Sequence, residues 1–181
     1  MFLEKQLILR FNRGDTDALR DIYARYKDDL VSLAAALLQD KNAAEDAVHD
    51  VFARLVQRQD TLRISQNLRA YLTTSAANMA RQHFRKRQKS PESSLDASGM
   101  DRPGKELPPE SAMLDGEQKQ LLTNALADLP YEQREAVLLR HYSDLTFRKI
   151  ASAQNVSVNT VLGRYRYGID KLRSRLNGEL P

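Results

Sequence analysis

Apolar side chains in residues 1–89 recur every three or four positions, which is the period of a helix with one buried face. Three such stripes follow one another: Leu19, Ile22, Tyr23, Tyr26, Leu30, Leu33 and Leu37; then Ala44, Ala47, Val48, Val51, Phe52 and Leu55; then Leu68, Leu72, Ala76 and Met79. A polar break, QDKN, separates the first two, and Asn42 with Glu45 predicts a capping box for the second helix. The sequence contains no alternating run of β-branched residues, so no strand is predicted.

The C-terminal part of the chain has the same helical period. Leu121, Leu122, Ala125, Leu126 and Leu129 form one stripe, and Pro130 permits a new helix over 131–142. Two more helices are predicted over 147–154 and 158–176, with Asn155 in a left-handed turn and Ser157 as N-cap, the layout of a helix-turn-helix. The expected inward stripe of the last helix is Val158, Val161, Tyr165, Ile169, Leu172 and Leu176.

A segment without periodic apolar residues separates these parts. Residues 90–117 hold four of the six prolines and seven acidic residues against Arg102 and Lys105. That composition predicts a flexible acidic linker, or a segment whose charge mimics nucleic acid. The fold expected is all-α, with a helical domain over 1–89, a linker over 90–116 and a helix-turn-helix domain over 117–181.

The composition of the 181 residues excludes several classes of function. There is no cysteine, the three histidines are scattered, and no glycine-rich nucleotide motif occurs, so we expect no metal, cofactor or disulfide. The longest apolar stretch, Leu30–Leu38, is too short to span a membrane, and the N-terminus does not resemble a signal peptide. We therefore expect no membrane insertion and a cytoplasmic location.

Positive charge is concentrated rather than large, since the net charge is only +4. Residues 81–89, RQHFRKRQK, carry five cations and no acid within about 13 Å of helix. Such a helix end attracts DNA phosphates, and His83 and Phe84 suit unstacked bases. The alternative is a solvated helix end favoured by the helix dipole.

Two other helices present polar faces. The helix over 158–176 places Asn159, Thr160, Gly163, Arg164 and Arg166 away from its apolar stripe, as a recognition helix does, although an ordinary helical hairpin would also expose charges. The helix over 43–58 carries a second polar face. Its members are Glu45, Asp46, His49, Asp50, Arg54 and Gln57. This face is either a docking surface or a set of i,i+4 pairs.

These segments, in this order, resemble the extracytoplasmic-function (ECF) sigma factors of bacterial RNA polymerase. The matching stretches are IYARYKDDLVSLAAALLQDKNAAEDAVHDVFARLVQR, NLRAYLTTSAANMARQHFRKRQ and LADLPYEQREAVLLRHYSDLTFRKIASAQNVSVNTV. The resemblance implies a promoter-recognition factor that is not an enzyme. Its implied partners are core RNA polymerase, promoter DNA and, as for many relatives, an anti-sigma factor. The linker would thread toward the RNA exit channel.

The resemblance also implies roles for particular residues. Those that would dock on the polymerase are Asp46, Asp50, Arg54 and Gln57. Those that would grip the unpaired −10 strand are Asn67, Arg69, Tyr71, Asn78, Arg81, Gln82, Arg85 and Lys86. Asn78 and the loop over 62–67 would hold a flipped base, which costs a few kcal/mol to extrude. Those that would read the −35 element are Ser157, Asn159, Thr160, Gly163, Arg164 and Arg166.

The chain departs from the family pattern at several positions. Leu162 and Gly163 stand where a lysine and a serine are usual, Gln82 where aspartate is common, and Val56 where tryptophan is frequent. Asn155 replaces the usual turn glycine.

Two other functions are alternatives to a promoter-recognition factor. One is a stand-alone helix-turn-helix regulator that binds DNA without polymerase. The other is a nuclease whose magnesium would be held by Glu45, Asp46 and Asp50.

Overall fold

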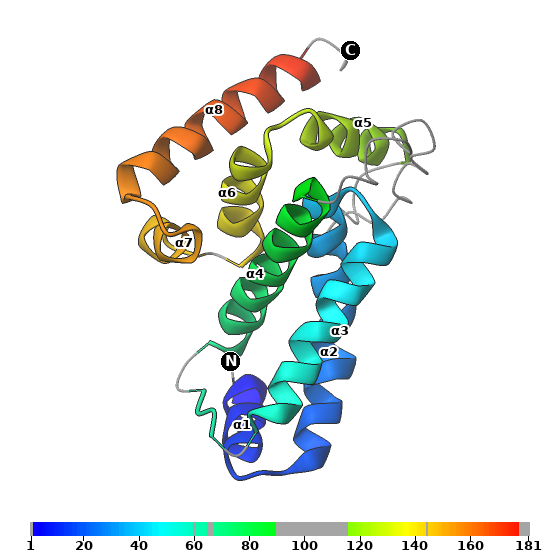
Figure 1. The fold of residues 1–181 in the computed structure, drawn as a ribbon, viewed down its shortest axis with the longest axis vertical. Coiled ribbons are helices and arrows are strands. Elements are labelled where there is room, and N and C mark those ends of the chain that lie inside the picture. Colours follow the sequence, from blue (N-terminus) through cyan, green and yellow to red (C-terminus); the bar gives the residue numbers. More distant parts are fainter. Residues whose placement is uncertain (1, 60, 65–66, 90–115, 144, 178–181) are drawn as a thin grey trace.

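The fold consists of helices and their connections, in a computed structural model that describes residues 2–59, 61–64, 67–89, 116–143 and 145–177 (Figure 1). The helices are α1 (Phe2–Asn12), α2 (Thr16–Leu38), α3 (Lys41–Gln57), α4 (Leu68–Lys89), α5 (Gly116–Ala127), α6 (Tyr131–Tyr142), α7 (Phe147–Gln154) and α8 (Val158–Leu176). No strand occurs in these residues, which confirms the all-α expectation. The predicted linker, residues 90–116, lies outside the described residues apart from Gly116.

The first helix, α1, was not predicted from the sequence. It packs on the N-terminal end of α2 through Leu7, Ile8 and Phe11, which occur at the i, i+1, i+4 spacing of a helix face and are all buried. Arg10 of α1 forms two ion pairs here: its Nε lies 2.7 Å from Asp15 and its Nη1 lies 2.7 Å from Asp21.

Side-chain caps fix where α2 ends and α3 begins. Gln39 ends α2 in the left-handed region at φ 57°, at the polar break that the sequence predicts. The N-cap of α3 is Asp40, whose carboxylate accepts a hydrogen bond from Ala43 N at 3.0 Å. The prediction of Asn42 as the cap was wrong by one half-turn, because Asp40 offers an equally good acceptor two residues earlier in the same break.

A first apolar core joins α1, α2, α3 and α4. Its largest wholly buried side chains include Phe11, Ile22, Leu55, Leu68 and Leu72. The three stripes read from the sequence supply most of this core. At roughly 25 cal/mol for each Å2 of apolar surface removed from water, such burial is the main term that holds these helices together.

The helix-turn-helix forms as the sequence predicts. Asn155 has φ 54°, and Ser157 Oγ accepts a hydrogen bond from Thr160 N at 3.1 Å to cap α8. Val161 and Leu172 are buried against α6 and α7, as expected. Val158 does not belong to the inward stripe: it is 38% exposed, like the next two residues in the first turn of α8.

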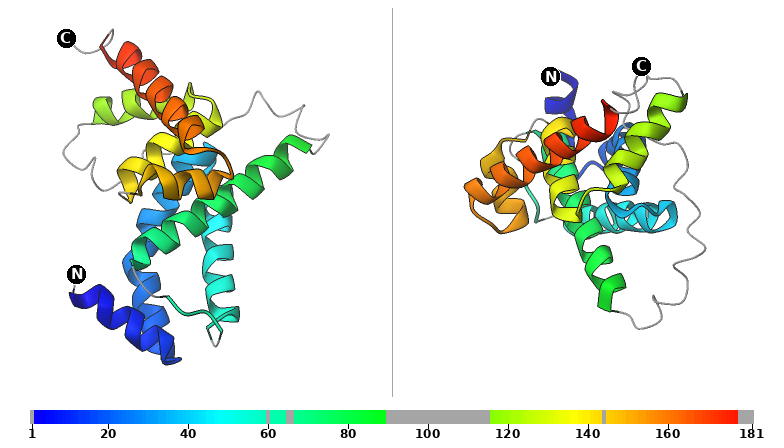
Figure 2. Two further views of the ribbon diagram at one scale, coloured as in Figure 1. Left: turned by 90° about the vertical axis from the view of Figure 1, so that its left-hand side faces the viewer. Right: turned by 90° about the horizontal axis from the view of Figure 1, so that it is seen from above.

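A second apolar core includes both predicted domains. Leu33 and Leu37 of α2 and Ala77 and Ala80 of α4 share a cluster with residues of α5 to α8. The views in Figure 2 show α6 lying across α4 and the C-terminal end of α2, and contacts of α6 with both helices agree. The two domains therefore pack directly on each other in this structure.

Candidate nucleic-acid interface

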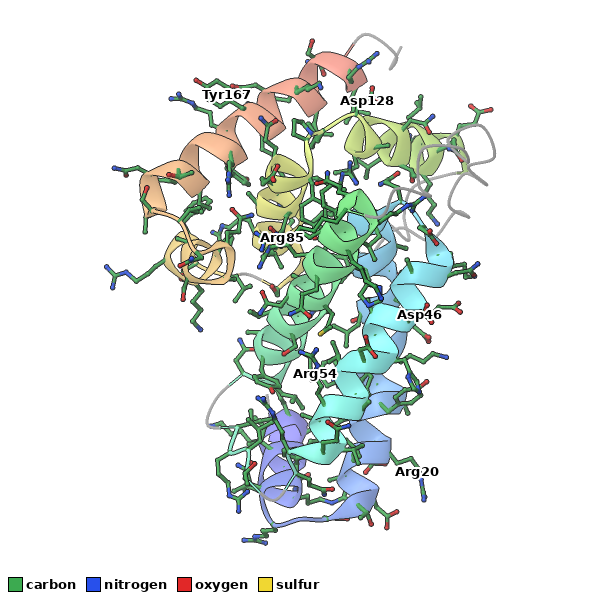
Figure 3. All side chains as sticks on the ribbon, viewed as in Figure 1. Arg20, Asp46, Arg54, Arg85, Asp128 and Tyr167 are labelled. Carbon is green, nitrogen blue, oxygen red and sulfur yellow. The ribbon has the colours of Figure 1, made fainter. Side chains whose placement is uncertain are left out.

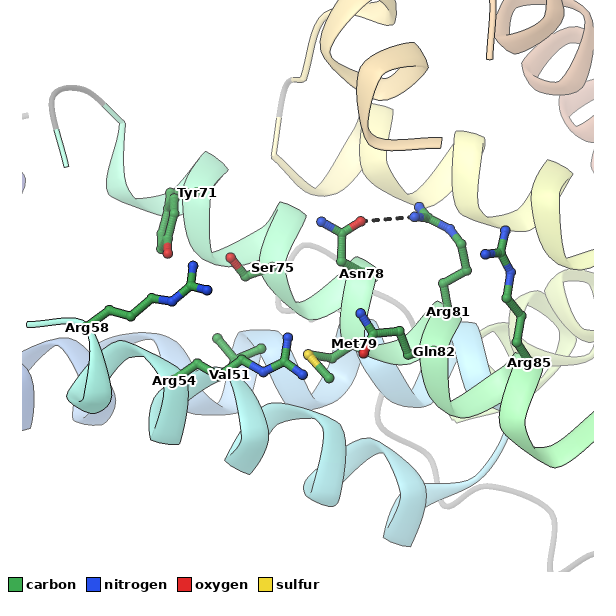
Figure 4. A pocket seen from close by; sticks show the side chains of 10 residues that line it. All are labelled: Val51, Arg54, Arg58, Tyr71, Ser75, Asn78, Met79, Arg81, Gln82 and Arg85. Atoms are coloured by element: carbon green, nitrogen blue, oxygen red, sulfur yellow. Dashed lines mark hydrogen bonds between the residues drawn. The ribbon is translucent and has the colours of Figure 1, made fainter. Parts of the chain in front are cut away.

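A hollow of about 330 Å3 runs between α3 and α4 (Figure 4). Its lining consists of Val51, Arg54, Arg58, Tyr71, Ser75, Asn78, Met79, Arg81, Gln82 and Arg85. Five of these belong to the set predicted to grip the −10 strand: Tyr71, Asn78, Arg81, Gln82 and Arg85. Helix α4 thus brings together, on one face, residues that the sequence places over four turns.

The hollow is strongly positive. It is lined by four arginines and by no aspartate or glutamate. Arg54, Arg58 and Arg85 are exposed, and within the described part of the chain their side chains have no hydrogen-bond or ion-pair partner. Unpaired cations around a concave surface favour the binding of a polyanion. Positively charged grooves of this kind are used by proteins that bind single-stranded nucleic acid.

The rest of the lining suits a base rather than a phosphate. Tyr71 is half-buried against the first core and keeps one part of its ring toward the hollow. Asn78 offers an amide, whose oxygen accepts a hydrogen bond from Arg81 Nη1 at 2.9 Å. Val51 and Met79 are buried and form an apolar floor. An aromatic ring, an amide and an apolar floor together match an unstacked base.

Three residues predicted for the −10 strand lie outside the hollow. Asn67 caps α4, because its Oδ1 accepts a hydrogen bond from Ala70 N at 2.7 Å. Arg69 Nη2 lies 3.9 Å from Asp29 on α2, and Lys86, the residue after Arg85, is exposed just beyond the lining. Of the predicted loop over 62–67, residues 65 and 66 lie outside the described residues.

The residues predicted to dock on polymerase divide into two groups. Asp46, labelled in Figure 3, and Gln57 are both exposed on α3. Asp50 lies 3.3 Å from His83 Nε2 of α4, so it does not form the alternative i,i+4 pair with Arg54 among the described contacts. Arg54 lines the hollow, where the sequence reading did not place it.

The sequence reading also missed Arg58 and Ser75, which line the hollow. Arg58 follows Arg54 by one helical turn, and Ser75 follows Tyr71 by one turn. Helical spacing from residues already chosen would have identified both. Their relevance depends on how α3 and α4 face each other, which the sequence pattern alone does not define.

One end of the hollow is covered by the helix-turn-helix domain. The Arg81 side chain is only 15% exposed and binds the carboxylate of Glu135 on α6, and it also donates to Ala153 O at 2.8 Å. Glu135 is 1% exposed. Burial raises the pKa of Glu135, and the charge and hydrogen bond of Arg81 oppose that rise.

The same carboxylate connects to α8. Gln154 Nε2 donates to Glu135 at 2.8 Å, and Arg164 Nη1 donates to Gln154 Oε1 at 2.7 Å. The buried Glu135 therefore binds Arg81, which is predicted for the −10 strand. Through the Gln154 amide it also connects to Arg164, which is predicted for the −35 element.

Other contacts reinforce the packing of the two domains. Phe84 stacks on Tyr131 with ring centroids 4.3 Å apart. The Tyr131 hydroxyl is buried without a hydrogen-bond partner among the described residues, and this burial raises its pKa. Tyr142 Oη donates to Asp29 O at 2.9 Å, and Arg134 Nη1 donates to Leu37 O at 2.8 Å. Burial lowers the pKa of Arg134.

The outer face of α8 carries the residues predicted for the −35 element. Ser157 and Thr160 are joined by hydrogen bonds in the cap, while Asn159 is exposed. Arg166 is exposed and lies over the ring of Tyr167 at 5.4 Å. Except for Arg164, this face is open to solvent, as a helix that enters a DNA groove must be.

The alternative of a magnesium-dependent nuclease requires carboxylates grouped around a metal ion. Across the described residues, no three His, Cys, Asp or Glu side chains are grouped so as to hold a metal ion. In the same part of the chain, no helix has both the length and the apolar character needed to cross a membrane.

Comparison with protein families gives two matches, one for each predicted domain. Residues 22–90 match the Sigma-70 region 2 model, and residues 119–165 match the Sigma-70, region 4 model. The order of the two matches along the chain is the order that the sequence predicts.

Full-length relatives cover almost the whole chain. The ECF RNA polymerase sigma factor SigW of Bacillus subtilis (strain 168) is 28% identical over 181 residues, covering 95% of this chain and 96% of the relative. The ECF RNA polymerase sigma factor EcfG of Rhodopseudomonas palustris (strain TIE-1) is 30% identical over 166 residues, covering 91% and 86%.

Two solved structures share the fold. The sigma factor RpoE from Bartonella quintana, crystallised with the anti-sigma factor NepR, has a TM-score of 0.68 at 24% identity, over 88% of this chain and 97% of that one. CnrH in complex with the cytosolic domain of CnrY has a TM-score of 0.64 at 20% identity, over 96% of each chain. At these identities the likeness establishes the fold alone.

Proposed function

This chain belongs to the ECF sigma factors of bacterial RNA polymerase, and we propose how its residues divide the work of promoter recognition. The hollow between α3 and α4 binds the unpaired −10 strand, and the outer face of α8 reads the −35 element in the major groove. The chain catalyses no reaction, because RNA synthesis belongs to the polymerase.

The observation that carries this proposal is the lining of the hollow. Unpaired arginines supply attraction for phosphates, while Tyr71 and Asn78 offer stacking and hydrogen bonds to one base. Extruding a base costs a few kcal/mol, which stacking at about 1–3 kcal/mol per base and hydrogen bonds offset. A hollow that attracts only phosphates would not need the apolar floor of Val51 and Met79.

The polymerase-binding surface follows from what remains exposed on α3. Asp46, Gln57 and the apolar Val56, 52% exposed, lie on the outer side of this helix. We assign this side to docking on core polymerase, and Asp50 to the border between docking and the hollow. An anti-sigma factor is a further partner in this proposal, since two relatives of the same fold were solved with such a factor or with another protein domain.

The role of the hollow is tested with Asn78→Ala in holoenzyme assembled from core polymerase and the full chain. Promoter opening, followed by permanganate reactivity of unpaired thymines, should fall at least tenfold, while closed-complex affinity changes less than threefold. Asn124→Ala, an exposed asparagine of α5, is the matched control and should change neither. Equal losses in closed binding and opening would contradict the assignment of Asn78 to a base pocket.

The stand-alone regulator makes a different prediction. If α8 alone sufficed, the chain would select a duplex sequence without polymerase, and α3 substitutions would not matter. The match of residues 22–90 to Sigma-70 region 2 gives no support to that reading.

A further inference from the structure

Helix α8 contains two glycines, and packing within the protein explains only one of them. A Cβ at Gly168 would lie 2.9 Å from Val137 Cγ2 and 3.4 Å from Gln133 O, so α6 packs too close for any side chain there. A Cβ at Gly163 would meet no atom within 4 Å. Glycine is among the poorest helix-forming residues, so its use at an open, mid-helix position is not explained by packing.

The surface around Gly163 is apolar as well as basic. Leu162 is 42% exposed and Val158, one turn earlier, is 38% exposed. Arg166 follows Leu162 by one turn, and Arg148 and Lys149 are exposed on the neighbouring α7. Neither of these two α7 cations has a side-chain partner among the described contacts. The helix-turn-helix therefore exposes apolar side chains as well as unpaired cations.

We propose that Leu162 contacts a thymine methyl group in the −35 major groove and that Gly163 lets α8 approach the DNA closely enough for that contact. This inference rests on the proposed function of α8, and it adds which base α8 recognises. The C5-methyl of thymine is the apolar group that base pairs present in the major groove, and apolar side chains recognise it. A residue without a side chain permits close approach of a backbone to its ligand.

Duplex DNA is the occupant that the charges favour. The exposed cations of α7 and α8 complement DNA phosphates, whereas an apolar protein partner would gain nothing from these charges. Leu162 and Gly163 would then give α8 an apolar contact specific for thymine.

The first experiment combines a substitution in the protein with a base replacement in the DNA, as in a double-mutant cycle. Holoenzyme containing the full chain selects its −35 element from a random duplex library, and each selected thymine is then replaced by uracil, which lacks only the methyl. One replacement should lower wild-type affinity about fourfold, corresponding to about 0.8 kcal/mol for one buried methyl-sized group. With Leu162→Ala the same replacement should change affinity less than 1.5-fold.

The second experiment separates DNA approach from protein stability. Gly163→Ala should raise the Tm by about 2–4 °C, because alanine favours the helix, while it lowers affinity for the selected duplex at least tenfold. Gly168→Ala is the matched control: it should lower the Tm through its contact with Val137. Together the two variants distinguish a glycine needed for DNA from one needed for packing.

The outcomes are distinguishable. A selected −35 element whose binding is indifferent to uracil, or to Gly163→Ala, overturns the thymine inference and leaves the proposed function of α8 standing. Loss of partner-protein binding in Leu162→Ala with DNA binding unchanged also overturns it, in favour of a protein-docking patch. If no −35 element is selected at all, the proposed function of α8 fails together with the inference.

Discussion

Arg134 shows how one side chain can hold two domains together. Its guanidinium is buried and donates to four carbonyls: Leu126 O at 2.9 Å, Ala127 O at 3.1 Å, Leu129 O at 2.9 Å and Leu37 O at 2.8 Å. Three of these belong to the end of α5 and the turn after it, where helix carbonyls lack intrahelical partners. A cation at this end also complements the helix dipole.

Replacing Arg134 by Met should therefore lower the free energy of unfolding by about 2–4 kcal/mol, because four carbonyls lose the guanidinium as a donor in a buried site. Urea denaturation followed by circular dichroism measures the change. The control is Arg148→Met, which removes an exposed arginine of α7 and should change stability by less than about 0.5 kcal/mol. Equal stability of the two variants would show that water replaces the guanidinium.

At the residue scale, the sequence predicted caps better where only one polar residue was available. Ser157 and Asn155 were assigned correctly because each is the only suitable residue at its turn. The cap of α3 was misassigned because Asp40 and Asn42 both stand at the break, and choosing between them requires the backbone angles of the chain entering the helix.

At the scale of helices, periodicity gave the bounds of α6, α7 and α8 as the structure has them. It missed α1, whose three buried residues gave too short a stripe to be noticed beside its exposed Leu3 and Leu9. The hollow was only half predictable: α4 carried its own signal in basic and aromatic residues, whereas the facing wall of α3 needed the crossing of the two helices.

The basic end of α4 gives a prediction at the same scale. Arg85 lines the hollow and Lys86 lies just beyond it, and both are exposed. The double variant Arg85→Ala/Lys86→Ala should weaken holoenzyme binding to promoter DNA across sequences. The slope of log K against log salt should become shallower by about 1.4–1.8, because two phosphate contacts are lost.

A control for this variant removes the same charge elsewhere. Arg13 and Arg20 are exposed near α1 and the start of α2, away from the hollow (Figure 3 labels Arg20), so Arg13→Ala/Arg20→Ala should leave the slope within about 0.3 of wild type. A matching reduction in both variants would mean that α4 contributes only general charge.

At the scale of the whole molecule, the structure shows the two domains packed with a DNA-binding candidate inside the interface. The guanidinium of Arg81 is engaged by Glu135, Asn78 and Ala153 in this arrangement, rather than being free for a DNA strand. Sequence reading could not reveal this, because Arg81 and Glu135 lie 54 positions apart on helices whose apolar stripes are each complete without the contact.

Removing the carboxylate should loosen this packing. In Glu135→Ala, Arg81 becomes a buried cation without a counter-charge, which favours separation of the domains. Small-angle X-ray scattering of the free chain should show a larger radius of gyration than in wild type. Glu132→Ala, which removes an exposed glutamate from the same helix, should leave the radius unchanged; an unchanged radius in both variants would mean that apolar contacts alone hold the domains.

The central claim is that this chain directs polymerase to promoters with two elements. The most direct measurement maps the 5′ ends of RNA made from genomic DNA fragments by bacterial core RNA polymerase, with and without the purified chain. A promoter-recognition factor should give new 5′ ends that appear only with the chain and share two upstream sequence elements at a fixed spacing. RNA 5′ ends that are the same with and without the chain, from a chain that folds and binds DNA by itself, would contradict this claim.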